Sequence, residues 1–291
     1  MFKRGCFIVA SLLLYEERGD SYMFSFEYNG QSTETIVDKP LRIVQFDSMN
    51  DIDGFHREII KGEKTLLRQE VNHYGAMYSD DSTYEFYLVK VDGSPFTEIE
   101  QRKINKWLTS PQLVKPLNCV TDDGENVIYR GVFQNVGWKM ITGRMDGVKC
   151  SLVCDTPFSW KKETHSYSCT DSLDIELNID SDDSECFIYP KITVTTPNTM
   201  QTIQLINNSD SGNKMEILCY PNLQISIDCK YCIITDGTIS GIVDYKDLGW
   251  KDAGNIYWTR LKDGVNLLTI KGECNLIITY DIPLKRAGDF V

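Results

Sequence analysis

The stretch Asp155-Thr156-Pro157-Phe158-Ser159-Trp160 separates two parts of the sequence that differ in pattern. Proline fixes φ and donates no backbone hydrogen bond, so a proline between strand-like runs favours a turn or a linker. Upstream, short strand-like runs accompany one strong helix pattern, and downstream the runs are almost all strand-like. The 291 residues are enough for about two domains.

We therefore predict a mostly β protein with one clear helix. A β-rich domain covers residues 23–155 and a β-sandwich or jelly roll covers residues 156–291. A return of the last strands to the first domain stays open.

The clearest helix pattern lies between Thr97 and Pro111. Thr97 and Glu100 form a T-x-x-E capping box, which satisfies backbone N–H groups at the start of a helix, and Pro111 ends it. An apolar stripe at helical spacing predicts that one helix face packs onto the sheet of the first domain. The stripe consists of Ile99, Ile104, Trp107 and Leu108. We interpret Trp107 as a core residue, with a ligand-stacking tryptophan as the alternative.

The second part alternates apolar and polar residues most regularly over Leu173–Asp180. Such a period of two predicts a strand with one buried and one exposed face. The exposed face is acidic, because Asp171–Glu185 carries seven acidic residues. We interpret this run as a solvated face, with calcium binding as the alternative. Further short runs between polar loops, and a final hairpin, are typical of a sandwich.

The formal net charge of −12 argues against a nucleic-acid-binding surface, which is normally basic. No apolar run reaches the roughly 20 residues that a membrane-spanning helix needs. We therefore expect no specific nucleic-acid binding and no membrane span.

Ten cysteines raise the question of disulfides or a metal site. Cys229 and Cys232 lie in a segment with a strand pattern, where residues three apart point to opposite faces and could chelate only at a turn. Cys150 and Cys154 share a strand face but lie about 13 Å apart at about 3.3 Å per residue, which is too far for one zinc ion. We predict mostly reduced, buried thiols, and no metal or cofactor.

The first 22 residues contain Lys3, Arg4 and a short apolar run, an arrangement that imitates a signal peptide. The acidic residues that follow leave no small-x-small cleavage site. Codons for Glu17–Asp20 can resemble a ribosome-binding site just upstream of Met23. We favour a translated leader or disordered extension over residues 1–22. A signal peptide and an ordered N-terminal element are the alternatives, and the choice between Met1 and Met23 as the true start stays open.

The standard motifs of catalytic sites are missing from the sequence. Gly143–Gly147 lacks the lysine and hydroxyl of a phosphate-binding loop, and no G-x-S-x-G nucleophile elbow occurs. His56 and His73 lie in polar, loop-like stretches and His165 follows a charged cluster, and none of the three is at ligand spacing to another. We predict that the protein is not an enzyme. A Cys–His dyad and a carboxylate pair acting on glycans are the alternatives, because such pairs form in space rather than in sequence.

Several stretches resemble the distal tail protein family of long-tailed bacteriophages, and they follow the family's order along nearly all of residues 23–285. The likeness is carried by the opening strand and turn, an R-x-I-x-x-W-L helix, the strands that close the first domain, and an L-x-x-G-x-N ending. These stretches are Met23–Gly30, Arg102–Leu108, Tyr129–Gly131, Val148–Asp155 with Pro157, and Tyr257–Asn266.

This resemblance implies a structural component of a phage or prophage tail tip. Its first domain would form a homo-hexameric ring that joins the tail tube to the baseplate, and its second domain would be galectin-like. The implied partners are the tail tube protein, the tape measure protein and the tail-associated hub or lysin, with a receptor-binding protein or a host glycan as further candidates. The implied location is the distal tail tip of the virion, after assembly in the host bacterial cytoplasm. The family has no catalytic motif to carry over.

The alternative function is a carbohydrate-binding adhesin module that contacts the host cell surface. Exposed aromatic rings can stack on the apolar faces of sugars, and Trp250, Tyr257 and Trp258 are the candidates in the second domain. Packing in the core is the favoured interpretation of each of them.

Overall fold

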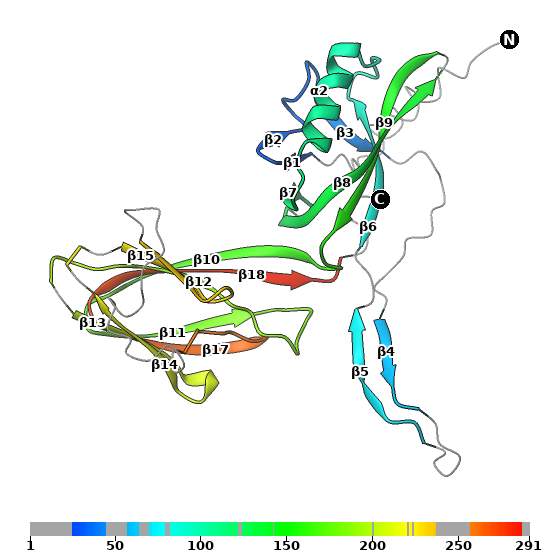
Figure 1. Cartoon of the computed structure of the whole chain (residues 1–291). Coiled ribbons are helices and arrows are strands. Elements are labelled where there is room, and N and C mark those ends of the chain that lie inside the picture. Colours follow the sequence, from blue (N-terminus) through cyan, green and yellow to red (C-terminus); the bar gives the residue numbers. More distant parts are fainter. Residues whose placement is uncertain are drawn as a thin grey trace. The chain divides into compact units, whose positions relative to one another are not determined.

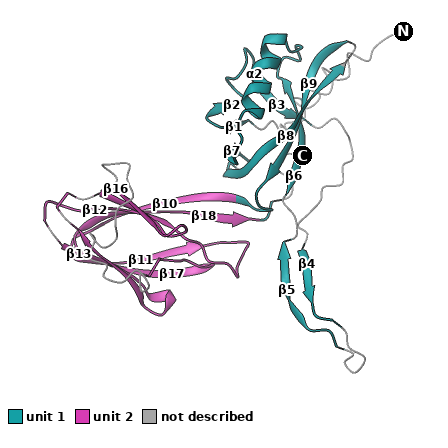
Figure 2. Ribbon diagram, in the orientation of Figure 1, with its two compact units in different colours: residues 1–159, 285–291 teal, residues 160–284 magenta. Residues whose placement is uncertain are grey.

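The computed structural model describes residues 25–44, 57–63, 70–78, 82–121, 124–141, 143–199, 201–219, 221–222, 224–236 and 257–286. The chain divides into two compact units (Figure 1, Figure 2). Unit 1 comprises Met1–Ser159 and Lys285–Val291, and unit 2 comprises Trp160–Leu284. The described residues are mostly β-strand with one α-helix, which confirms the predicted fold class.

Unit 1 contains an antiparallel sheet with the strand order β2-β1-β7-β8-β9-β6-β3. Its strands are β1 (Phe26–Tyr28), β2 (Gln31–Ser32), β3 (Leu41–Val44), β6 (Thr83–Lys90), β7 (Lys115–Val120), β8 (Asn126–Ile141) and β9 (Arg144–Cys154). Asn29 and Gly30 between β1 and β2 have φ values of 50° and 73°, so the predicted turn is confirmed. A Cβ atom on Gly131 in β8 would lie 2.5 Å from the carbonyl oxygen of Val153, so β8 and β9 approach closely only because this residue is glycine.

Helix α2 (Glu98–Thr109) packs on this sheet (Figure 1). The capping box is confirmed, because the Glu100 carboxylate accepts a hydrogen bond from the Thr97 backbone N–H at 2.8 Å. Ile104, Trp107 and Leu108 are buried as predicted, but the prediction for Ile99 is wrong, since its side chain is 72% exposed. At about 100° per residue the buried stripe starts at Glu100 and continues at the fourth, seventh and eighth positions after it, which leaves Ile99 on the outer side.

A separate two-stranded sheet consists of β4 (Arg57–Lys61) and β5 (His73–Tyr78). Neither strand was predicted from the sequence. The prediction that His73 lies in a loop-like stretch is wrong, because His73 is the first residue of β5. His56 and the predicted leader lie outside the described residues.

Unit 2 contains two antiparallel sheets, with the strand orders β16-β15-β12-β18-β10 and β11-β17-β13-β14. One hydrophobic core takes side chains from both sheets, so the unit is a β-sandwich. Leu173–Ile179 alternates between exposed and buried residues as predicted. The strands are β10 (Ser159–Cys169), β11 (Ser172–Ile179), β12 (Lys191–Thr195), β13 (Gln201–Asn207), β14 (Asn213–Cys219), β15 (Gln224–Asp228), β16 (Ile233–Asp236), β17 (Gly264–Lys271) and β18 (Cys274–Leu284), and a short 3-10 helix, η1 (Asn208–Asp210), follows β13.

None of the nine described cysteines forms a disulfide, and seven of them are buried. Cys229 and Cys232 lie at the turn between β15 and β16, so their assignment to one continuous strand is wrong. Cys229 is buried and Cys232 is exposed. Burial raises the pKa of Cys229 to about 12, which keeps it a neutral thiol at ordinary pH.

Candidate assembly surface

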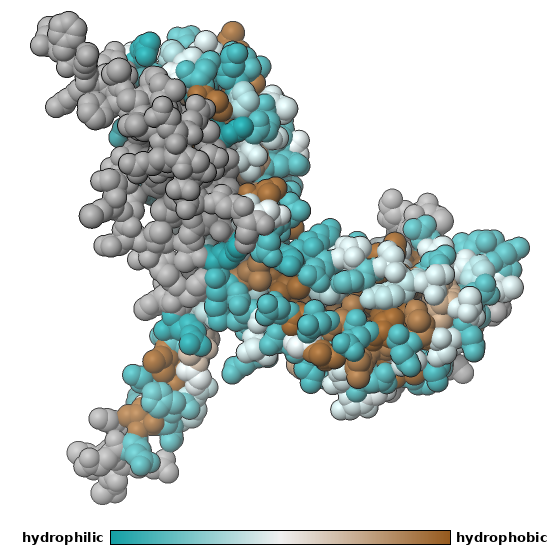
Figure 3. All heavy atoms as spheres, turned by 180° about the vertical axis from the view of Figure 1, so that it is seen from behind, coloured by the Kyte–Doolittle hydropathy of each residue, from teal (hydrophilic) through white to brown (hydrophobic). Residues whose placement is uncertain are grey.

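The hairpin of β4 and β5, here called the hairpin arm, exposes apolar side chains along its length (Figure 3). Ile59, Tyr74 and Met77 are 52%, 66% and 53% exposed, and neither strand has a buried residue. A hairpin of two strands is at best marginally stable alone in water, and clustered exposed apolar side chains mark interaction sites. The hairpin arm is therefore the strongest candidate in unit 1 for contact with another protein.

The residues of the hairpin arm explain its local structure. β-branched and aromatic side chains favour strands, and β4 and β5 contain Ile59, Ile60, Tyr74 and Tyr78. Across the two strands, Ile59 lies opposite Ala76 and Arg57 lies opposite Tyr78. A register shift follows Ile60. Because both faces are exposed, these cross-strand pairs are the main support that the arm has from its own residues.

The root of the hairpin arm is held in unit 1 by Tyr78. The Tyr78 ring meets the Phe158 ring edge to face, with 4.8 Å between the ring centroids. The ammonium group of Lys285 lies 5.7 Å from the centroid of the Tyr78 ring. These contacts fix one end of the arm and leave the rest of it exposed.

The unit 1 sheet also offers edges for pairing. Within the described residues, β3 and β2 are the outermost strands of this sheet. Edge strands carry backbone N–H and C=O groups that a strand from another chain can pair with. β3, with four residues, is the longer of these two edges.

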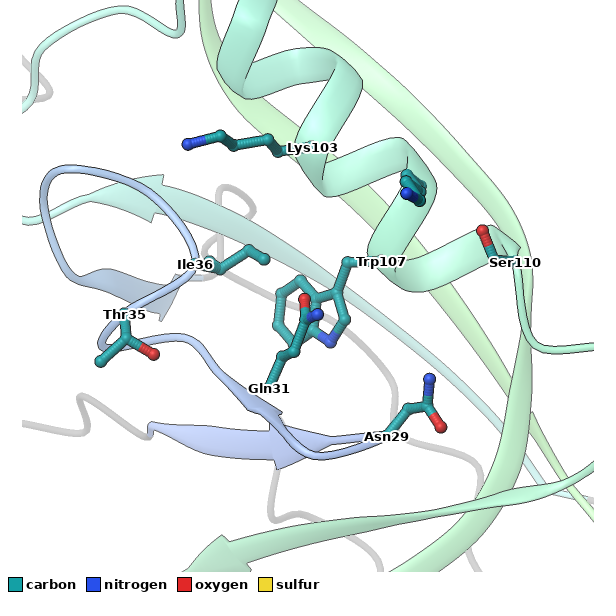
Figure 4. Close-up of a pocket in the computed structure, with 8 residues that line it drawn as sticks. Asn29, Gln31, Thr35, Ile36, Lys103, Trp107 and Ser110 are labelled. Atoms are coloured by element: carbon teal, nitrogen blue, oxygen red, sulfur yellow. The ribbon is translucent and has the colours of Figure 1, made fainter.

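A groove of about 470 Å³ lies between α2 and the β1–β2 turn (Figure 4). Trp107 lines the groove. Its indole N–H donates to the carbonyl oxygen of Tyr28 at 2.8 Å, and its ring stacks on the Phe26 ring with 5.6 Å between the centroids. This burial confirms the interpretation of Trp107 as a core residue. The charged residues of the lining are Lys103 and Lys106, so the groove is basic in a chain of net charge −12.

A buried ion pair fixes the start of α2 to β6. The Lys90 ammonium lies 2.7 Å from a Glu100 carboxylate oxygen, with both side chains at least nine-tenths buried. Burial alone would raise the pKa of Glu100, but hydrogen bonds from Lys90 and Thr97 outweigh it and lower this pKa to about 2. Glu100 is therefore ionised at neutral pH, and α2 is held in place by charge as well as by packing.

Two of the three candidate sugar-stacking residues pack against the core of unit 2. Tyr257 and Trp258 are partly buried there, and Trp250 lies outside the described residues. The Tyr257 hydroxyl donates to Asp210 at 2.9 Å and accepts from Asn207 at 3.1 Å. Burial, and then the Asp210 carboxylate, raise the pKa of Tyr257 to about 12. Sugar stacking by these three residues stays a prediction.

The described residues contain no group of three His, Cys, Asp or Glu side chains arranged to hold a metal ion. They also include no helix that is long and apolar enough to cross a membrane. His165 lies 3.1 Å from the Tyr280 hydroxyl and 3.4 Å from Glu163. Neither partner of His165 is a cysteine or a serine, so this cluster lacks the nucleophile of a dyad.

Comparison with known proteins identifies the two units. A family model described as a phage tail protein N-terminal domain matches residues 22–156, and one described as a phage tail C-terminal domain matches residues 158–280. The chain therefore belongs to the phage tail proteins that these two domains define. No curated protein sequence matches the chain.

Solved structures place the fold among tail-hub proteins. The Dit protein of phage SPP1 shares 13% identity, with a TM-score of 0.60 over 89% of this chain and 99% of that one. A chain of the phage P2 baseplate, in its activated conformation with calcium, shares 11% identity, with a TM-score of 0.53 over 92% of this chain and 99% of that one. The chain is thus a phage tail protein, and it shares its fold with these Dit and baseplate structures, in agreement with the resemblance of its sequence to the distal tail family.

Proposed function

We propose that this protein forms a homo-hexameric ring at the distal tail tip of a phage or prophage, joining the tail tube to the baseplate. The shared fold supports the proposal, because the SPP1 Dit structure is described as a hub adsorption apparatus of phages that infect Gram-positive bacteria. The observation that carries it is the hairpin arm, where Ile59, Tyr74 and Met77 are more than half exposed.

Rings form from head-to-tail contacts, so one protomer must present two different and complementary surfaces. The hairpin arm supplies one surface and the β3 edge of the unit 1 sheet supplies the other. In the ring, the arm of each copy adds to the sheet edge of the next copy, which pairs its backbone groups and buries its apolar side chains.

The ring encloses a channel through which the tape measure protein and DNA pass. A basic lumen would retain phosphates, whereas an acidic lumen repels them. The net charge of −12 per chain is compatible with an acidic lumen. The tail tube protein contacts the ring on one side, and the tail-associated hub or lysin and a receptor-binding protein contact it on the other. The role is structural, without catalysis.

The test compares oligomeric states of the full chain by light scattering and cryo-electron microscopy. The double variant Ile59→Asp, Met77→Asp places two charges on the hairpin arm and should yield monomers. Ile99→Asp is the matched control, because Ile99 is also an exposed apolar residue but lies on α2. A ring that survives the double variant, or that Ile99→Asp disrupts equally, contradicts the role of the arm. A monomeric wild-type protein contradicts the ring.

Carbohydrate binding by unit 2 is the second candidate function. The observation that favours it is a pair of exposed aromatic side chains, Phe187 and Tyr189, which are 41% and 42% exposed. This pair differs from the three residues that the sequence indicated.

A further inference from the structure

Phe187 and Tyr189 project from the same side of an extended segment. Ile188 between them is buried and forms an isolated antiparallel bridge with Leu261, with N–H to O distances of 2.8 Å and 2.7 Å. Residues two apart in an extended chain point to one face and lie about 7 Å apart. The two rings therefore stand side by side on the surface of unit 2.

Arg260 completes this surface from the opposite side of the bridge. Its guanidinium carbon lies 4.1 Å from the centroid of the Phe187 ring. Asp210 holds the guanidinium in place, with Nε donating to Oδ2 at 2.8 Å and Nη2 donating to Oδ1 at 3.2 Å. Within the described residues the Nη1 group of Arg260 has no partner, so it can donate to a ligand.

Buried groups behind Arg260 make its position rigid. Asn207, which is 1% exposed, donates to the backbone carbonyl oxygen of Arg260 at 2.7 Å and to the Tyr257 hydroxyl at 3.1 Å. Tyr257 in turn donates to Asp210. A site whose donor is already held in place loses little conformational entropy when a ligand binds.

We propose that Phe187, Tyr189 and Arg260, here called the aromatic platform, bind a pyranose residue of a neutral polysaccharide. The apolar C–H face of a pyranose ring lies on an aromatic ring, and the hydroxyls at its rim accept hydrogen bonds from the free Arg260 donors. This proposal rests on the second candidate function, carbohydrate binding by unit 2, and not on ring formation.

The size and charge of the aromatic platform favour a neutral sugar over other ligands. Asp210 neutralises Arg260, so the platform lacks the uncompensated charge that selects an anion. A stable protein interface takes roughly 20–30 residues on each side, and the platform has far fewer.

The experiment measures binding of maltohexaose, cellohexaose and chitohexaose to the full chain by saturation-transfer NMR and calorimetry. At least one of these neutral oligosaccharides should bind, and Phe187→Ala or Arg260→Lys should weaken its affinity at least about tenfold. Raising the salt from about 0.05 M to about 0.5 M should change the affinity less than about twofold, since no net charge is involved.

Tyr74→Ala is the matched control, because Tyr74 is an aromatic residue that is also exposed, at 66%, but lies on β5 of the hairpin arm in unit 1. This variant should bind like the wild type. Each variant is checked by thermal unfolding, where Phe187→Ala should match the wild type because the ring is exposed.

Absence of binding to all three oligosaccharides overturns the platform, as does equal weakening by Tyr74→Ala or strong weakening by salt. Binding of another tail protein that needs Phe187, without any sugar binding, shows a protein interface instead and also overturns it. If the chain is monomeric and binds sugar through Phe187, the platform is supported and the ring is refuted. If the chain forms a ring but binds no sugar, the ring is supported and the platform is refuted.

Discussion

Helix α2 and the hairpin arm belong to the same unit and use similar apolar residues in opposite ways. The helix buries Ile104, Trp107 and Leu108 against the sheet, whereas the arm leaves Ile59 and Met77 in solvent. The helix is therefore stabilised by burial within its own chain, whereas the arm gains little stability from burial in the described structure. The same substitution, from a large apolar residue to a small or charged one, should thus have different costs in the two regions.

The largest effect is expected at Trp107. Trp107→Ala removes a buried ring and its hydrogen bond to Tyr28, and should lower the free energy of unfolding by about 3–5 kcal/mol. Denaturant titration followed by circular dichroism measures this loss. Trp107→Phe, which retains most of the packing, should cost less. An unchanged midpoint for Trp107→Ala would mean that α2 contributes little to the core.

A smaller loss is expected at the ion pair of Lys90 and Glu100. Glu100→Gln removes a buried charge partner and should cost about 1–3 kcal/mol at neutral pH. Because folding lowers the pKa of Glu100 from 4.5 to about 2, its contribution is present above pH 4.5 and is lost as the pH falls towards 2. Denaturation measured across this range should converge for the wild type and the variant at low pH. Parallel curves down to pH 2 would contradict the depressed pKa.

The stability of the isolated subunit should hardly change when the hairpin arm is altered. In monomeric protein, Ile59→Asp with Met77→Asp should shift the free energy of unfolding by no more than about 0.5 kcal/mol per substitution, because both side chains are already in solvent. The comparison with Trp107→Ala is made under the same denaturant conditions. A loss as large as that of Trp107→Ala would show that the arm packs on its own chain, and would remove the contrast between the two regions.

The smallest expected signal concerns thiol reactivity. Cys186 and Cys232 are exposed and should react with a thiol reagent in the native protein. The seven buried cysteines should react only after unfolding, since burial keeps the reagent away from their sulfur atoms. Mass spectrometry after native and denaturing labelling counts both groups. Fast native labelling of Cys150 or Cys219 would contradict the packed cores.

The features that the sequence predicted are those with a local physical cause. The capping box of Thr97 and Glu100, the Asn29-Gly30 turn and the alternation over Leu173–Ile179 each depend on neighbouring residues, and the structure contains all three. The wrong prediction for Ile99 has a local cause too. The buried stripe of α2 starts at Glu100, and a pattern that counts only apolar residues does not include a glutamate.

The features that the sequence did not predict lack such a local signal. The hairpin arm buries neither face, so its sequence lacks the alternation of apolar and polar residues that predicts a strand. Ile59 and Ile60 are adjacent and are flanked by charged residues. The aromatic platform joins Phe187 to Arg260, which is far along the chain, through a bridge that only the fold creates. The C-x-x-C at Cys229 lies at a turn that has no glycine or proline to mark it.

The order of the units along the chain gives the molecule a topology of insertion. Unit 2 begins after Ser159 and ends before Lys285, so the polypeptide leaves unit 1 and comes back to it. A single proteolytic cut at either crossing therefore leaves the units covalently connected through the other. Phe158 and Lys285, beside the two crossings, both contact Tyr78 at the root of the hairpin arm. A force that pulls on unit 2 is thus shared by two backbone connections, and a residue beside each connection contacts Tyr78.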